Sequence, residues 1–214
     1  MRSILVWSWR LCRLALLPIA AGVIAVTGSL LYLGPRLPSV EVLRDVRFQE
    51  PLRVYSRDGL LMGEFGEMRC TPVRFEQIPQ VLIHAVLAAE DDRFLRHHGV
   101  DFGGLSRAAW ELATTRSIQS GGSTITMEVA RNYFLSRDQT FVRKFNEILL
   151  ALQIERELDK QQILELYLNK IFLGYRAYGI EAAAQVYYGR PIEQLSLDEA
   201  ALIAGLPKAP SALN

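Results

Sequence analysis

The feature that most constrains this chain is a run of 20 residues without a charged side chain, Leu14–Leu33. A helix rises about 1.5 Å per residue, so this run extends roughly 30 Å, the thickness of the hydrocarbon core of a bilayer. Three arginines precede the run, which predicts that residues 1–13 stay in the cytoplasm. The alternative is a cleaved signal peptide, whose apolar core is shorter, about 7–15 residues. We therefore expect one transmembrane helix over 14–33, with the rest of the chain outside the cytoplasm.

Composition narrows the classes of function that the chain can have. Its 214 residues suffice for the anchor and one further domain, and a net charge of +1 gives no basic excess for binding nucleic acid. The two cysteines, Cys12 and Cys70, lie far apart in different contexts and indicate neither a disulfide framework nor a zinc site. No organic cofactor is expected.

The exported part begins with a linker and a small β element. Residues 34–51 contain three prolines and predict the linker. The apolar runs Leu52–Tyr55 and Leu60–Phe65 flank Asp58-Gly59, a tight-turn signal, so we expect a hairpin. A third strand is expected over Arg69–Phe75. Beyond it the apolar spacing is helical almost throughout, so the fold class is mainly α with a small N-terminal β element.

Apolar spacing and capping residues place the helices. Thr140 can cap a helix that reaches about Leu158, and Asp159 with Gln162 forms a capping-box-like pair at the start of the next. Residues 105–112 predict a helix or a membrane-facing segment. The other helices are expected over 78–89, from the Gly121-Gly122-Ser123-Thr124 start to Phe134, over 181–188 and over 197–206.

The first candidate for catalysis is an acidic cluster in an unexpected place. The apolar stripe of residues 78–89 runs directly into Glu90-Asp91-Asp92. Carboxylates at the end of a buried helix are costly to desolvate unless they have partners or a task. Such a place can produce a carboxylate with a perturbed pKa that is suited to proton transfer. The alternative is a solvated helix end with ordinary polar residues.

A second carboxylate, Glu147, lies in the middle of the helix expected over 140–158. Arg143 and Lys144 precede it by four and three residues, so the three side chains share one face. A surface salt-bridge face is the alternative. The helix is apolar nearly all round, however, which is typical of a buried helix. We therefore expect the three charges to line a cleft.

Between the two acids, the chain carries features that suit an anion. Glycines in the 121–126 segment allow a close approach of backbone to ligand, and the helix that follows presents its N-terminus. Arg131, Arg143 and Lys144 can bind phosphate. Together with two acids, these features fit a reaction with a phosphorylated leaving group, and the membrane anchor suggests a lipid-linked substrate.

Five segments, in this order, resemble the motifs of the peptidoglycan glycosyltransferases (glycosyltransferase family 51), the lysozyme-like domain of class A penicillin-binding proteins. They are Glu90-Asp91-x-x-Phe94-x-x-His97-x-Gly99, Gly121-Gly122-Ser123-Thr124-Ile125-Thr126, Arg143-Lys144-x-x-Glu147, Ile163-Leu164-Glu165-Leu166-Tyr167-Leu168-Asn169 and Gly179-Ile180-Glu181-Ala182-Ala183-Ala184. The opening Arg53-Val54-Tyr55-Ser56 and the closing residues 205–210 most resemble the penicillin-binding protein 1A branch. The resemblance implies a lysozyme-like glycosyltransferase domain over 52–214.

The resemblance also implies a reaction. The domain would polymerise lipid II, a disaccharide-pentapeptide on undecaprenyl pyrophosphate, into glycan strands. Glu90 would act as general base on the acceptor 4-hydroxyl, whose oxygen attacks and inverts the donor's anomeric carbon and expels the lipid pyrophosphate. Glu147 would stabilise or orient that pyrophosphate, with Mg²⁺ or Mn²⁺ held by Glu147 as an optional partner.

The residues that contact substrate are implied in the same way. Ser123 and Thr124 would line the donor site, and the three cations would neutralise the developing charge. His97 has an alternative role as a hydrogen-bonding pin of the Glu90 loop, and Phe94 has one in packing. The full implied set is Asp91, Phe94, His97, Gly121, Ser123, Thr124, Arg131, Arg143 and Lys144.

Location and partners follow from these implications. We expect a single-pass protein of the inner (cytoplasmic) membrane with its catalytic domain in the periplasm. Its partners would be lipid II, the lipid-linked glycan chain, the membrane, and a transpeptidase domain or other cell-wall synthesis proteins. Class A proteins continue into a transpeptidase domain, but these 214 residues contain no Ser-x-x-Lys nucleophile.

Three departures from the family pattern keep other functions open. Met127 and Glu128 stand where the family usually has two glutamines, and Gln139 stands where many members have arginine. These changes support a catalytically impaired scaffold domain as an alternative. A lysozyme-like enzyme that cleaves finished peptidoglycan is the other, although that chemistry requires neither the cationic third motif nor a lipid anchor.

Overall fold

The computed structural model describes residues 28, 37–46, 52–65, 69–115, 122–135 and 140–208. The chain divides into two units, Met1–Pro38 and Ser39–Asn214, and the second holds nearly all of these residues. The predicted transmembrane helix over 14–33 lies outside the described residues apart from Gly28. In the described part, no helix is both long and apolar enough to cross a bilayer.

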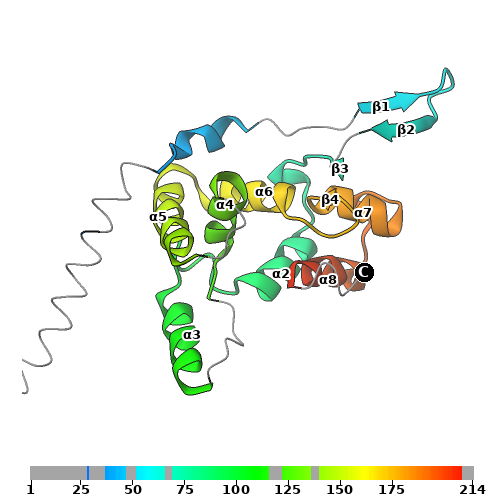
Figure 1. Ribbon diagram of the computed structural model, residues 1–214. Coiled ribbons are helices and arrows are strands. Elements are labelled where there is room, and N and C mark those ends of the chain that lie inside the picture. The colour runs from blue at the N-terminus through cyan, green and yellow to red at the C-terminus, as the bar shows by residue number, and fades with distance from the viewer. Residues whose placement is uncertain are drawn as a thin grey trace, which may run out of the picture. The chain divides into compact units, whose positions relative to one another are not determined.

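The second unit is mainly helical, as predicted (Figure 1). Its α-helices are α2 (Gln80–Glu90), α3 (Phe102–Thr115), α4 (Ile125–Phe134), α5 (Phe141–Glu157), α6 (Lys160–Lys170), α7 (Ile180–Tyr188) and α8 (Leu197–Gly205). Short 3-10 helices are η2 (Val40–Asp45), η3 (Phe75–Gln77), η4 (Ile192–Gln194) and η5 (Leu206–Lys208). The strands in the described part of the chain are β1 (Leu52–Tyr55), β2 (Leu61–Phe65), β3 (Arg69–Cys70) and β4 (Ala177–Tyr178).

The predicted hairpin is confirmed. Strands β1 and β2 pair antiparallel from Leu52 opposite Phe65 to Tyr55 opposite Leu61. Gly59 in the connecting turn has a φ of +80°, which glycine adopts without the steric cost that a side chain brings.

The third predicted strand, Arg69–Phe75, was too long. Strand β3 ends at Cys70 and pairs in parallel with β4, which the sequence did not indicate. Beyond Cys70, the Asn169 side chain of α6 takes the place of a strand partner. Its Oδ1 accepts from the Val73 N–H at 2.9 Å, and its Nδ2 donates to the Val73 carbonyl at 2.8 Å. A side-chain amide therefore satisfies this backbone, and the sheet does not extend.

Capping residues set the helix starts where the sequence placed them. Thr124 and Thr140 accept hydrogen bonds from the third backbone N–H of α4 and α5, and Asp159 forms a capping box with Gln162 at the start of α6. Helix α4 packs against α5 and α6, and α2 packs against α8. Fully buried side chains at these contacts include Leu82, Ile125, Val129, Leu150, Ile154, Ile163 and Ile203. This core holds the ends of α2 and α4 in place.

The predicted 105–112 segment is part of α3, which extends from Phe102 to Thr115. Large apolar side chains on this helix are exposed, with Phe102 and Trp110 each at 72%. Helix α3 is the next helix after the acidic cluster, and its first turns contribute to the site described next.

Candidate active site

The candidate site is a cavity of about 560 Å³ beside the end of α2. Its walls come from the end of α2, the first turns of α3, the start of α4 and the end of η5. The lining residues are Ala89, Glu90, Asp91, Asp92, Asp101, Gly104, Arg107, Gly122, Ser123, Thr124, Glu128 and Lys208. Two of the predicted motif segments, the acidic cluster and the Gly-Ser-Thr helix start, thus share one cavity.

Glu90 is the last residue of α2 and faces this cavity. Its Oε1 atom is buried and has no hydrogen-bond partner among the described residues. The pKa of Glu90 is raised from its ordinary value of 4.5 to about 7, chiefly by burial and next by the negative charge on Glu128. Lys208 and Arg131 oppose this rise, and Asp91 adds a smaller one. A carboxyl group with this pKa exchanges its proton near neutral pH, as a general base requires.

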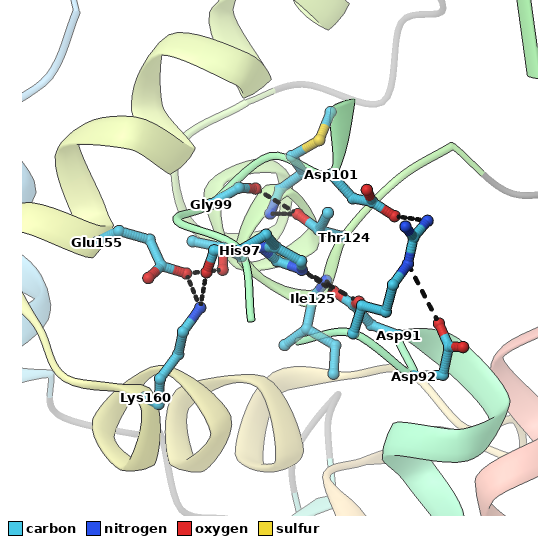
Figure 2. A network of polar contacts seen from close by, with 12 residues as sticks. Asp91, Asp92, His97, Gly99, Asp101, Thr124, Ile125, Glu155 and Lys160 are labelled. Atoms are coloured by element: carbon cyan, nitrogen blue, oxygen red, sulfur yellow. Dashed lines mark hydrogen bonds and ion pairs between the residues drawn. The ribbon is translucent and has the colours of Figure 1, made fainter. Parts of the chain in front are cut away.

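Asp91 anchors the loop that follows Glu90 to the start of α4 (Figure 2). Its two carboxylate oxygens lie 3.1 and 3.0 Å from Nε2 of His97. The Ile125 N–H, in the first turn of α4, donates to Oδ2 of Asp91 at 3.1 Å. The geometry matches the interpretation of His97 as a pin of the Glu90 loop.

Thr124 strengthens the same connection. Its Oγ1 donates to the Gly99 carbonyl at 2.6 Å and accepts from the Met127 N–H at 3.2 Å. Gly99 itself has a φ of +83°, and a Cβ atom there would lie 2.7 Å from the Ala151 carbonyl oxygen of α5. The first motif therefore ends in a glycine because the backbones of the loop and α5 approach too closely for a side chain.

Phe94 belongs to the core beneath this loop rather than to the cavity. Its side chain is 1% exposed, and it packs edge-on against the His97 ring. The ammonium group of Lys160 lies over the Phe94 ring, 4.3 Å from its centre, and also donates to the His97 carbonyl at 2.8 Å. The role of Phe94 as a substrate contact stays a prediction, whereas these contacts support its role in packing.

Lys160 and Glu155 complete the network shown in Figure 2, and sequence reasoning missed both. Oε1 of Glu155 accepts from Lys160 Nζ at 2.6 Å and from Thr126 Oγ1 at 2.7 Å. A glutamate and a lysine five residues apart across a helix break give no signal in the sequence. Their role follows only from the fold, which brings α5, α6 and the loop together.

Glu147 lies on α5, in an environment that differs from that of Glu90. Its side chain is buried, and both its oxygens face cations. Arg143 donates to Oε1, and Lys144 Nζ lies 3.1 Å from Oε2. Lys144 Nζ also donates to the Ser123 hydroxyl at 2.7 Å, and Ser123 lines the cavity. The prediction that Arg143, Lys144 and Glu147 line a cleft is not met at this cavity, because none of the three is among its lining residues. Glu147 connects to the cavity only through Lys144 and Ser123.

The predicted divalent cation finds no open carboxylate at Glu147. Mg²⁺ and Mn²⁺ prefer several oxygen ligands, but the two oxygens of Glu147 already face Arg143 and Lys144. Within the described ranges, no group of three His, Cys, Asp or Glu side chains could hold a metal. The cation stays a prediction, and no step proposed below depends on it.

Arg131 pairs with Glu128 on α4, with Nη2 of Arg131 2.9 Å from Oε1 of Glu128. Only Glu128 of this pair lines the cavity. Gly121 and Gln139 lie outside the described residues. Arg107 and Lys208 bring positive charge into the cavity, and sequence reasoning did not assign either to the site.

The chain is similar in sequence to a known protein family and to several curated proteins. The family model described as transglycosylase matches residues 58–214. The chain belongs to the transglycosylase family. Penicillin-binding protein 1A of Pseudomonas aeruginosa is 65% identical over 191 residues, which are 89% of this chain and 23% of that protein. Penicillin-binding protein 1A of Escherichia coli is 51% identical over 201 residues, which are 94% of this chain and 24% of that protein.

The resemblance that the five motifs gave is thereby confirmed. The chain spans about a quarter of the length of the curated relatives it matches. A crystal structure of penicillin-binding protein 1A from Haemophilus influenzae is 34% identical and covers 79% of this chain and 16% of that chain, with a TM-score of 0.39. Membership of the transglycosylase family therefore rests on sequence and not on this superposition.

Proposed function

We propose that this transglycosylase domain polymerises lipid II into peptidoglycan glycan strands by inverting glycosyl transfer, with release of undecaprenyl pyrophosphate. One observation carries the proposal. Glu90 places a buried carboxylate oxygen, without a hydrogen-bond partner among the described residues, at a cavity, and its pKa is raised to about 7, chiefly by burial. A carboxylate in this state is able to take a proton from a sugar hydroxyl, which neither a solvated nor an ion-paired carboxylate does as well.

The reacting atoms balance in a single displacement. Glu90 takes the proton of the acceptor 4-hydroxyl, and the oxygen of that hydroxyl forms a bond to the anomeric carbon of the donor. The bond from that carbon to the pyrophosphate oxygen breaks, and the pyrophosphate leaves with the electron pair. A positioned general base contributes on the order of 10²–10⁴-fold to such a rate.

The leaving pyrophosphate is assigned to the cationic side of the site. Lys144 reaches the cavity wall through its hydrogen bond to Ser123, and Arg143 lies on the same face of α5. Glu147 holds both cations in place from the buried side. In this assignment, Glu147 acts by positioning Arg143 and Lys144, which stabilise the developing negative charge.

The setting of the reaction is part of the proposal. The uncharged run Leu14–Leu33 supports an anchor in the cytoplasmic membrane, with the catalytic domain on the periplasmic side. A lipid-linked substrate would then reach the cavity while its tail stays in the bilayer. A transpeptidase domain of the longer protein, or other cell-wall synthesis proteins, would be its partners.

The test is incubation of the membrane-anchored protein with labelled lipid II, followed by separation of the products. We expect polymer that a muramidase digests. Cleavage of preformed glycan without polymerisation would indicate the peptidoglycan-cleaving enzyme instead, and neither activity would indicate the scaffold. In the same assay, Glu90→Gln removes the proposed base. Glu193→Gln is its matched control, because Glu193 is exposed on η4 and the chemical change is the same.

A further inference from the structure

Three charged side chains from separate segments meet at the cavity. Glu90 ends α2, Glu128 lies in the first turn of α4, and Lys208 ends η5. They lie 38 and 80 positions apart along the chain, so only the fold brings them together. Because Oε1 of Glu90 has no hydrogen-bond partner among the described residues, neighbouring charges add to the effect of burial on its protonation.

Most other charges near Glu90 are already committed to partners. Asp91 is held by His97 and the Ile125 N–H, and Asp101 forms an ion pair with Arg93. The Tyr167 hydroxyl is uncharged, since burial raises its pKa well above the ordinary value. The titratable and charged groups that face Glu90 or its cavity are Asp91, Asp92, Asp101, Arg107, Glu128, Arg131, Tyr167 and Lys208.

Glu128 and Lys208 stand out within this set. Glu128 is the largest charged contribution that disfavours the ionised form of Glu90, and Lys208 is the largest that favours it. Glu128 is fixed by its ion pair with Arg131. Lys208 is exposed and forms no ion pair among the described residues. In that part of the chain no partner neutralises its charge, which therefore acts on the cavity that it lines.

We propose that Glu128 and Lys208 are opposed positioning residues that adjust, in opposite directions, the protonation of the Glu90 carboxyl at the cavity that all three line. This inference rests on the proposed function for its kinetic meaning. Neither residue exchanges a proton with substrate. Glu128 keeps the Glu90 carboxyl basic enough to accept a proton, and Lys208 keeps enough of it ionised at neutral pH.

The experiment measures the pH dependence of kcat/KM for lipid II polymerisation in the membrane-anchored protein. Glu128→Gln removes a negative charge and releases Arg131, and both changes favour ionised Glu90. The acid limb should therefore move to lower pH by roughly half a unit, which is about threefold in rate on that limb. Lys208→Met should move the limb to higher pH by a similar amount, and the double variant should return towards the wild type.

Two control variants separate charge from structure. Lys208→Arg keeps the charge and should keep the wild-type midpoint. Glu193→Gln removes an exposed charge on η4 that does not line the cavity, and it should also keep the midpoint. A simple loss of structure at either site would lower the rate at every pH and leave the midpoint unchanged. Midpoints that stay fixed in both test variants, or that move in the same direction, overturn the inference.

A second readout does not need turnover. The carboxyl carbon of Glu90 is followed by NMR in protein labelled with ¹³C-glutamate, and its signal is assigned by its loss in Glu90→Gln. The Glu90 titration should shift in opposite directions in Glu128→Gln and Lys208→Met. If the wild type makes no polymer but the titration shifts as expected, the proposed function fails and the inference holds. If polymer forms but the Glu90 titration shifts in neither variant, the inference fails and the proposed function holds.

Discussion

Glu90 and Glu147 are both helix glutamates withdrawn from solvent, yet their surroundings differ in kind. Glu90 faces a cavity and has an oxygen without a partner, whereas both oxygens of Glu147 face cations. Burial without a partner disfavours charge and produces a group that can take up a proton. Burial between Arg143 and Lys144 balances the charge and produces a group that holds cations. In the proposed function, the same residue type thus acts as a base in one place and as an organiser of the leaving-group site in the other.

The largest effect is expected from a substitution at Glu90. Glu90→Gln keeps the shape of the side chain but removes its ability to accept a proton. We expect the rate of lipid II polymerisation to fall by about 10²–10⁴-fold. The circular dichroism spectrum should stay that of the wild type, because Glu90 makes no hydrogen bond through Oε1 that the variant would lose. Full activity in this variant would contradict the base assignment.

Glu147→Gln tests the other half of the comparison through stability. The change leaves Arg143 and Lys144, whose side chains are 17% and 36% exposed, without their shared counter-charge. Removing one member of a buried pair is strongly destabilising, and the partial exposure of Lys144 reduces the cost to about 2–3 kcal/mol. Urea denaturation measures it. An unchanged free energy of unfolding would show that Glu147 does not hold these cations.

A smaller effect is the pH dependence that Glu90 gives to the free energy of unfolding. The pKa of Glu90 is raised by folding, so wild-type stability falls as pH rises from its ordinary value of 4.5 through about 7. Glu90→Gln lacks this loss. At pH 8, the variant should therefore be more stable than the wild type by about 1–2 kcal/mol, a figure reduced because Glu90 is only half-buried. At pH 5, this advantage should be nearly absent, and thermal unfolding at the two pH values measures the difference.

The sequence was sufficient where the determinants are local. Apolar spacing located α2 to within two residues at each end, and the caps at Thr140 and Asp159 located the starts of α5 and α6. The acid at the end of a buried stripe pointed correctly to an environment that perturbs a carboxyl pKa. These signals depend on residues within a few positions of one another.

What the sequence did not contain are contacts between distant residues. Asn169 lies 96 positions from Val73, and its amide ends β3 early. Lys208 reaches the cavity from the far end of the domain, and Lys160 reaches the Glu90 loop across 63 positions. The same limit applies to Glu147, because the spacing of residues on α5 predicted its cations but not that Lys144 and Ser123 stand between it and the cavity.

The most direct test of the central claim is the pH dependence of kcat/KM for lipid II polymerisation by the wild-type, membrane-anchored protein. If Glu90 is the base in the environment described, the rate falls tenfold per unit on the acid side with a midpoint near pH 7. A rate that stays constant down to pH 5.5 would mean that the reaction uses an ordinary, solvated carboxylate or no base at all, and would contradict the account.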